Sequence, residues 1–144
     1  MEVKTKKILI IDDDSRNIFA LTAVLKAKKF NCLSAISAQQ GFDLLKDDTE
    51  IGVVLMDMMM PDMDGYEAMQ KMKNHPQMSA IPVIAVTAQA MVGDKEKVIN
   101  AGMSDHISKP LNVNAMFSTM ARWIVPARPT LLERTAENPT FALP

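Results

Sequence analysis

Four short strand-like runs, each followed at once by a charged or hydroxyl side chain, constrain the fold of this chain most strongly. Residues 8–11 precede Asp12 and Asp13, residues 53–56 precede Asp57, residues 83–86 precede Thr87, and residues 107–108 precede Lys109. Helical stretches separate these runs, which is typical of buried parallel strands. Ligands of an open α/β sheet bind at the carboxyl ends of its strands. We therefore expect these side chains to converge on one small pocket.

The complete pattern predicts five strand–helix units. Strands are expected at residues 8–11, 31–35, 53–56, 83–86 and 105–108, and helices at residues 15–25, 38–47, 66–74, 93–101 and 113–124. We expect Ser15 to cap the first helix. The alternation predicts an α/β fold in which helices cover both faces of a parallel sheet. Residues 1–126 are expected to form one domain, and the proline-rich residues 127–144 a linker or a disordered tail.

Composition excludes several classes of protein. The net charge of −1 argues against a nucleic-acid-binding surface. The single cysteine, Cys32, allows no internal disulfide. No apolar run is long enough to span a bilayer, and the N-terminal region does not resemble a signal peptide. We expect a cytoplasmic protein, or the cytoplasmic part of a membrane-bound one.

The chain contains 13 methionines, and several lie close together between residues 56 and 72. A redox or copper-binding role is one interpretation of this cluster. Because methionine fills irregular gaps in hydrophobic cores, we favour core packing.

The expected pocket would gather three carboxylates, one hydroxyl and one ammonium group. Clustered carboxylates are costly unless a cation neutralises them. A cluster of oxygen ligands that also serves a phosphate indicates Mg²⁺, with Mn²⁺ as a possible substitute.

Four motifs in this order resemble the receiver domain of two-component response regulators, over roughly residues 6–125. They are Ile-Asp-Asp-Asp at residues 11–14, the segment 55–65, Val-Thr-Ala at 86–88 and Ser-Lys-Pro at 108–110. Residues 14–17, 102–110 and 122–124 are most similar to receivers of hybrid histidine kinases. The resemblance implies a flavodoxin-like (βα)5 doubly wound sheet with strand order 2-1-3-4-5.

The resemblance also implies a phosphorelay function. Asp57 would accept a phosphoryl group from the phosphohistidine of a histidine kinase or of a histidine-containing phosphotransfer domain. Asp13 and Asp57 would bind Mg²⁺ directly, Asp12 would bind it through water, and the backbone carbonyl of Met59 would complete the protein ligands. No turnover of an external substrate is expected.

Further residues receive roles from the same resemblance. Lys109 and Thr87 would bind phosphoryl oxygens, the small Ala88 would leave Asp57 accessible, and Pro110 would orient Lys109 as a cis-proline. Thr87 would also act in a conformational switch.

His106 would be the partner of Thr87 in this switch, although the family usually has an aromatic residue at this position. Met59 and Gln89 are candidates for tuning the rate of phosphoryl hydrolysis.

Two alternatives remain open at this point. The Asp-x-Asp pattern of residues 12–14 fits a haloacid-dehalogenase-like phosphatase with Asp12 as nucleophile and Asp14 as general acid, although Arg16 replaces that family's usual Thr or Val. The other alternative is a degenerate receiver that acts only as a protein-binding module. The intact Asp57 and Lys109 argue against it.

Overall fold

The computed structural model describes residues 7–61, 63–88, 94–109 and 112–124. Strands and helices alternate as β1 (Lys7–Ile11), α1 (Ser15–Ala27), β2 (Asn31–Ala35), α2 (Ala38–Asp47), β3 (Ile51–Asp57), α3 (Gly65–Lys73), β4 (Val83–Thr87), α4 (Asp94–Asn100), β5 (Asp105–Ser108) and α5 (Val113–Trp123). The five strands pair in parallel in the order β2-β1-β3-β4-β5. The predicted fold and strand order are therefore confirmed.

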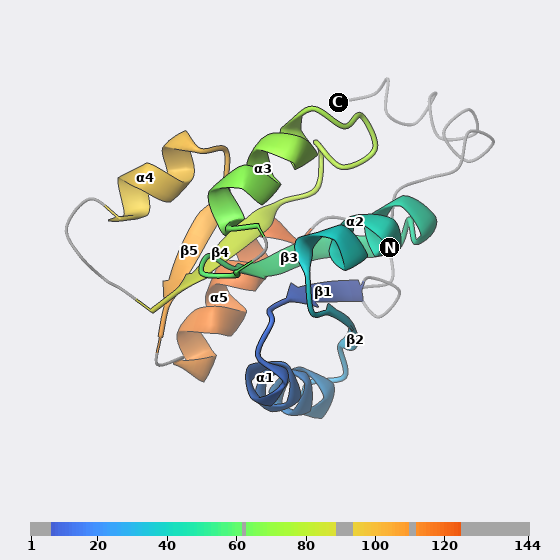
Figure 1. Ribbon diagram of the computed structural model, residues 1–144. Helices are drawn as coiled ribbons and strands as arrows, with labels where there is room; N and C mark the ends of the chain where they lie inside the picture. The colour runs from blue at the N-terminus through green and yellow to red at the C-terminus, as the bar shows by residue number, and fades with distance from the viewer. Residues whose placement is uncertain (1–6, 62, 89–93, 110–111, 125–144) are drawn as a thin grey trace, which may run out of the picture.

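Helices cover both faces of the sheet, as Figure 1 shows. Neighbouring residues of β1 point to opposite faces, so Leu9 and Ile11 pack with α2, α3 and α4, whereas Ile8 and Ile10 pack with α1 and α5. The middle strand β3 is buried along its whole length. This double burial explains why the strands read as continuous apolar runs rather than as alternating patterns.

Among the described residues, nine methionines are buried in these two core layers, which confirms the predicted packing role for them. Seven of the nine lie in the layer formed with α2, α3 and α4, and the other two are on α5. The nine are Met56, Met58, Met60, Met69, Met72, Met78, Met103, Met116 and Met120.

Helix caps fix where α1 and α3 begin. The prediction that Ser15 caps α1 is wrong, because the Asp14 side chain accepts the hydrogen bond from the backbone N–H of Arg16. A carboxylate suits this position because it also interacts favourably with the positive end of the helix dipole. Asp64 caps α3 in the same way.

The strand prediction for β3 was too short. The strand begins at Ile51 and includes Asp57, whereas the apolar run covers residues 53–56. Gly52 interrupts the apolar pattern, and the register with β1 shifts at this residue, from Lys7 opposite Ile51 to Ile8 opposite Val53, but the strand continues through it. Asp57 is thus the last residue of the central strand rather than the first residue of a loop.

Among the described residues, no helix is long and apolar enough to cross a membrane.

Candidate functional site

The carboxyl ends of four strands bring the predicted site residues together. Asp12 follows β1, Asp57 ends β3, Thr87 ends β4 and Lys109 follows β5. Because β1, β3, β4 and β5 are neighbours in one parallel sheet, these ends share one edge. Carboxylate oxygens of Asp12, Asp13 and Asp57 lie within 4.8 Å of one another. The predicted convergence is therefore observed for the three carboxylates and, through its ion pair with Asp57, for Lys109.

Asp12 is held in place by its neighbours. Its carboxylate accepts hydrogen bonds from the backbone N–H of Asp14 at 2.9 Å and from Nδ2 of Asn17 at 3.3 Å. The residue is buried, whereas Asp13 is exposed. Sequence reasoning missed Asn17, although its place in the first turn of α1, five residues after Asp12, puts it within reach of the carboxylate.

Asp57 is buried beside other charges. Burial raises the pKa of its carboxyl group, and the negative charges of Asp12 and Asp13 raise it further. The hydrogen bond from the backbone N–H of Met59 to Oδ1 at 3.2 Å and the positive charge of Lys109 oppose this rise. The net effect is a carboxylate whose negative charge is poorly compensated.

Lys109 supplies the positive charge of the pocket. Its Nζ lies 3.8 Å from Oδ1 of Asp57, which is an ion pair of loose geometry. Its backbone N–H donates to the carbonyl oxygen of Thr87 at 2.7 Å and so ties the end of β5 to the end of β4. Thr87 is largely buried and Ala88 is exposed. Pro110 and Gln89, the other predicted site residues of this region, lie outside the described residues.

His106 lies on β5, half-buried, next to Ala85 of β4. Its backbone N–H donates to Oδ1 of Asp105 at 2.8 Å. Within the described part of the chain, its buried Nδ1 has no hydrogen-bond partner. The ring also lines a cavity of about 320 Å³ between β5 and α5, together with Thr119.

Asp105 connects β5 to the end of α5. Its Oδ2 accepts a hydrogen bond from Nε1 of Trp123 at 3.0 Å and lies 3.9 Å from the guanidinium of Arg122. Burial raises the pKa of Asp105, but the hydrogen bonds from His106 and Trp123 and the charge of Arg122 outweigh it and hold the pKa below its ordinary value of 3.8. No local sequence pattern predicts this contact, because 18 residues separate the partners.

The chemistry of the acidic cluster fits a hard divalent cation. Carboxylates are the preferred ligands of Mg²⁺. Burial and the charges of Asp12 and Asp13 raise the pKa of Asp57, and a bound cation would oppose this rise by stabilising the ionised carboxylate.

Asp14 does not fit the general-acid role of the phosphatase alternative. Its carboxylate accepts from the backbone N–H of Arg16 at 2.9 Å and from the guanidinium at 3.3 Å. These hydrogen bonds with Arg16 lower the pKa of Asp14. A group that holds its proton so weakly is a poor general acid near neutral pH.

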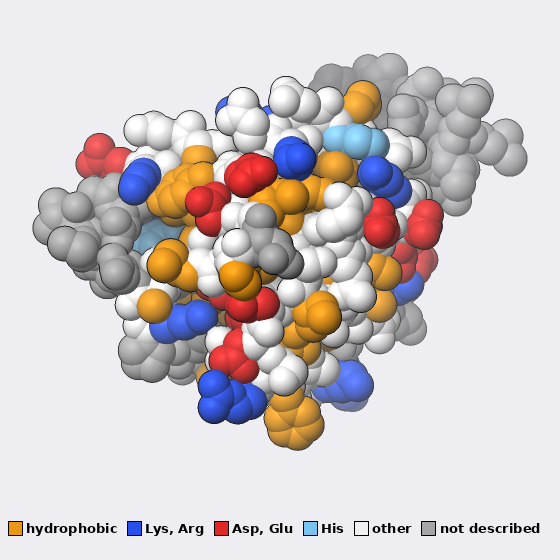
Figure 2. Space-filling model, viewed as in Figure 1, with side chains coloured by type: hydrophobic (Ala, Val, Ile, Leu, Met, Phe, Trp, Pro, Cys, Tyr) orange, Lys and Arg blue, Asp and Glu red, His pale blue; other side chains and the backbone are white. Residues whose placement is uncertain are grey.

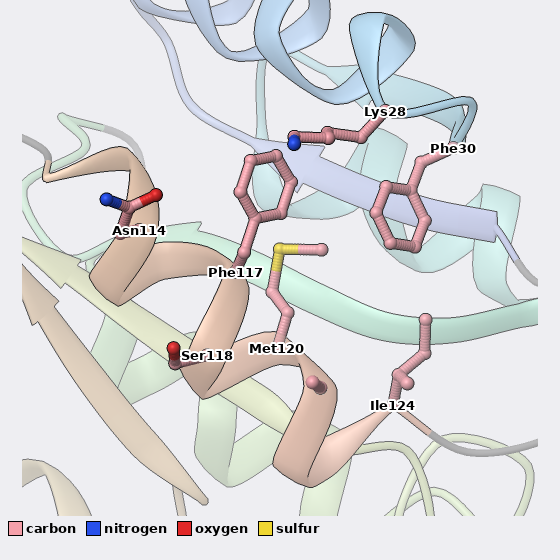
Figure 3. A pocket seen from close by; sticks show the side chains of 8 residues that line it. Lys28, Phe30, Asn114, Phe117, Ser118, Met120 and Ile124 are labelled. Atoms are coloured by element: carbon pink, nitrogen blue, oxygen red, sulfur yellow. The ribbon is translucent and has the colours of Figure 1, made fainter.

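A separate groove of about 800 Å³ lies between the end of α1 and one side of α5, as Figure 3 shows. Phe30 and Phe117 stack in it with ring centroids 6.0 Å apart, and Nζ of Lys28 lies 5.8 Å from the Phe117 ring. None of the residues that line it belongs to the acidic cluster, so its size does not make it the reactive site.

Comparison with known proteins agrees with the fold and the acidic pocket. The model of the family described as "Response regulator receiver domain" matches residues 8–121. The chain belongs to this family, and it is a receiver domain of two-component signalling. Nothing favours the phosphatase alternative.

Curated relatives differ in how much of their length the chain spans. The chain is 34% identical over 116 residues to the signal transduction histidine-protein kinase BarA of Escherichia coli K12, a match that covers 81% of this chain and 12% of BarA. It is 30% identical over 120 residues to the polar-differentiation response regulator DivK of Brucella ovis, covering 83% of this chain and 97% of DivK.

The similar solved structures include a receiver domain with a bound metal ion. The receiver domain of sensor histidine kinase PA1611 from Pseudomonas aeruginosa PAO1 is 27% identical, with a TM-score of 0.74, and the match covers 82% of this chain and 96% of that one. That structure has a magnesium ion coordinated in its active-site cleft.

Proposed function

We propose that Asp57 is the phosphoacceptor of this receiver domain and that it takes a phosphoryl group from a partner's phosphohistidine. The observation that carries the proposal is the position of Asp57. Its carboxylate ends the central strand, 3.8 Å from the Lys109 ammonium group and within 4.8 Å of two further carboxylates. Asp12 and Asp13 follow β1 and lie beside it.

The transfer forms one bond and breaks another. An oxygen of the Asp57 carboxylate attacks the phosphorus atom, the phosphorus–nitrogen bond of phosphohistidine breaks, and the imidazole leaves with the bonding electron pair. The product is an acyl phosphate. Positioning and neutralisation of the equatorial oxygens provide most of the catalysis in such transfers. Lys109 would neutralise one phosphoryl oxygen, the Thr87 hydroxyl would donate to another, and the small Ala88 would leave the approach open.

Mg²⁺ is the proposed cofactor, with Mn²⁺ as a substitute. When bound, it would supply the positive charge that neutralises phosphoryl oxygens. Asp13 and Asp57 would bind it directly, Asp12 through water, and Met59 through its backbone carbonyl. The magnesium ion in the PA1611 receiver domain supports this assignment, as does the poorly compensated charge of Asp57.

The proposed partner is a histidine kinase or a histidine-containing phosphotransfer domain. Large apolar side chains are exposed on the segments that follow β1, β2 and β3. Phe19 on α1, Ile36 after β2 and Met59 after β3 are 77%, 60% and 73% exposed. Figure 2 shows acidic side chains at the centre of this face and hydrophobic ones around them. Exposed apolar side chains on these segments favour a protein partner that brings a phosphohistidine to the pocket.

Phosphorylation is proposed to act through Thr87 and His106. Movement of the Thr87 hydroxyl toward the phosphoryl group would change the packing of β4 against β5. The cavity beside His106 gives the imidazole room to move. A buried polar atom without a hydrogen-bond partner is costly, so movement that gives Nδ1 of His106 a partner would be favourable. The surface of α4, β5 and α5 would then differ between two states. Gln89 and Met59 are proposed to tune hydrolysis, and Pro110 to orient Lys109.

The domain is proposed to comprise residues 1–126, with residues 127–144 as a linker. It acts either as a stand-alone regulator of the DivK type or as a module of a cytoplasmic hybrid-kinase region of the BarA type. No external substrate is turned over in either case.

A phosphorylation assay tests the proposal. The chain is incubated with Mg²⁺ and a small phosphoryl donor such as acetyl phosphate, and the modified residue is located by mass spectrometry. Modification at Asp57 that disappears in Asp57→Asn supports the proposal. Modification at Asp12 would revive the phosphatase alternative, and no modification would indicate a degenerate receiver.

A further inference from the structure

Met59 differs from the other methionines in its access to solvent. Its side chain is 73% exposed, whereas the nine buried methionines are at most 6% exposed. Met63 is half-buried against the core layer of α2 and α3. Met1 and Met91 lie outside the described residues. Within the described part of the chain, Met59 therefore has the thioether that a dissolved oxidant reaches most easily.

Met59 is exposed at a position next to the proposed phosphoacceptor. It follows Asp57 by two residues, and its backbone N–H donates to Oδ1 of Asp57 at 3.2 Å. The hydrogen bond fixes the first turn of the loop against the carboxylate. A chemical change of the Met59 side chain therefore takes place on a residue whose backbone is bonded to the proposed phosphoacceptor, and at an exposed position outside the buried core.

We propose that Met59 is a peroxide-sensitive modification site and that its sulfoxide shortens the lifetime of the phosphoryl group on Asp57. This inference rests on the proposed function of Asp57. The Met59 sulfur gains one oxygen atom from hydrogen peroxide and loses two electrons, the O–O bond breaks, and the peroxide is reduced to water. The product is methionine sulfoxide, which cellular reductases convert back.

The change in polarity explains the expected effect. A thioether is a weak hydrogen-bond acceptor and does not hold water beside the loop. A sulfoxide is polar, and its oxygen is a strong acceptor. Water is the nucleophile that hydrolyses an acyl phosphate. A side chain that binds water two residues from Asp57 therefore raises the occupancy of water near the acyl phosphate. Oxidation would thus convert an oxidant signal into faster loss of the phosphoryl group.

The first measurement follows oxidation without phosphorylation. The 144-residue chain is treated with dilute hydrogen peroxide in the folded state, and sulfoxide formation at each methionine is followed by peptide mass spectrometry. We expect Met59 to react at least about tenfold faster than the nine buried methionines. Equal rates at Met59 and at the buried methionines would overturn the inference.

The second measurement follows the phosphoryl group. Oxidised and untreated protein are phosphorylated with acetyl phosphate and Mg²⁺, the donor is removed, and the decay of the acyl phosphate is timed. We expect oxidation to speed decay by about threefold, far below the factor of about 100 that a positioned general base provides. Met59→Leu is the matched variant, because leucine cannot be oxidised, and peroxide should leave its decay rate unchanged. Reductase treatment should restore the slow decay of the oxidised protein.

The outcomes separate the two proposals. Untreated protein that accepts no phosphoryl group on Asp57 overturns the proposed function and this inference with it. Normal phosphorylation, with a decay rate that Met59 oxidation does not change, overturns this inference alone. An equal peroxide response in Met59→Leu overturns it as well, and Met63→Leu then tests the neighbouring thioether as the source.

Discussion

Replacing Asp57 with asparagine should stabilise the metal-free protein. Oδ1 of the amide still accepts the hydrogen bond from the Met59 backbone. The substitution removes a buried negative charge whose raised pKa shows that the folded state favours the neutral form. Asparagine resembles that neutral form, so the free energy of unfolding should increase.

The magnitude follows from the distances. At an effective dielectric constant of about 20, repulsion between Asp57 and Asp12, whose carboxylate oxygens lie within 4.8 Å, is at least about 3.5 kcal/mol, and attraction to Lys109 at 3.8 Å is about 4.4 kcal/mol. These two contributions nearly cancel. Burial of the charge and the more screened repulsion from Asp13 remain, and both favour asparagine. We expect a net stabilisation of about 1 kcal/mol, or about 3 °C in Tm for a chain of this size.

Magnesium should reverse the order of stability. A ligand that binds only the folded state adds about 1.4 kcal/mol at a tenfold excess over its Kd. Wild-type protein should gain this amount, whereas Asp57→Asn has lost one proposed ligand and should gain much less. The variant should therefore unfold at a higher temperature in chelator and at an equal or lower one in Mg²⁺.

Thermal unfolding by circular dichroism, in chelator and in a tenfold excess of Mg²⁺ over its measured Kd, measures both effects. Asp47→Asn makes the same change of charge at an exposed position of α2, and its Tm should differ little from that of the wild type in either buffer. A lower Tm of Asp57→Asn in chelator, or equal Mg²⁺ shifts in the variant and the wild type, would refute the electrostatic reasoning.

Three further predictions concern stability. In chelator, the raised pKa of Asp57 means that ionisation of this group destabilises the wild type as pH rises from about 3.8 through the folded-state pKa. The excess stability of Asp57→Asn over the wild type, measured by urea unfolding, should therefore shrink from pH 7 to pH 4. Trp123→Phe should cost about 1 kcal/mol at pH 7, because the hydrogen bond to Asp105 is lost. Because the pKa of Asp105 is lowered in the folded state, its ionised form stabilises the protein above about pH 3.8. The same urea series should therefore show the cost of Trp123→Phe declining as the pH falls toward and below that value. Gly65→Ala should cost about 1–3 kcal/mol in urea unfolding, because its Cβ would lie 2.3 Å from Sδ and 3.1 Å from Cα of Met58; a cost near zero would mean that the loop yields easily.

The sequence predicted the sheet and its reactive edge well because both depend on local patterns. Strands that are buried on both faces read as apolar runs, and parallel pairing places their carboxyl ends together. Asp12, Asp57, Thr87 and Lys109 could therefore be placed at the edge of the sheet before their distances were known.

The errors arose where a contact decides between local alternatives. Ser15 and Asp14 are both good caps, and only the backbone geometry of Asp14, with its hydrogen bond from Arg16, selects one. The bond between Asp105 and Trp123 depends on how α5 docks against β5, which no periodicity encodes. Exposure of Met59 amid buried methionines depends on the turn after Asp57, and the composition alone favours core packing for every methionine.

The indole of Trp123 gives this receiver an intrinsic optical reporter. The chain contains one tryptophan, so its fluorescence arises at a single site. Its Nε1 is bonded to β5, and the end of that strand is tied to β4 through the Lys109 backbone. Any displacement of β5 relative to α5 alters the polarity around the excited ring. Emission wavelength and quenching should therefore report, in unlabelled protein and in real time, the proposed shift of β5 when the acidic pocket is occupied.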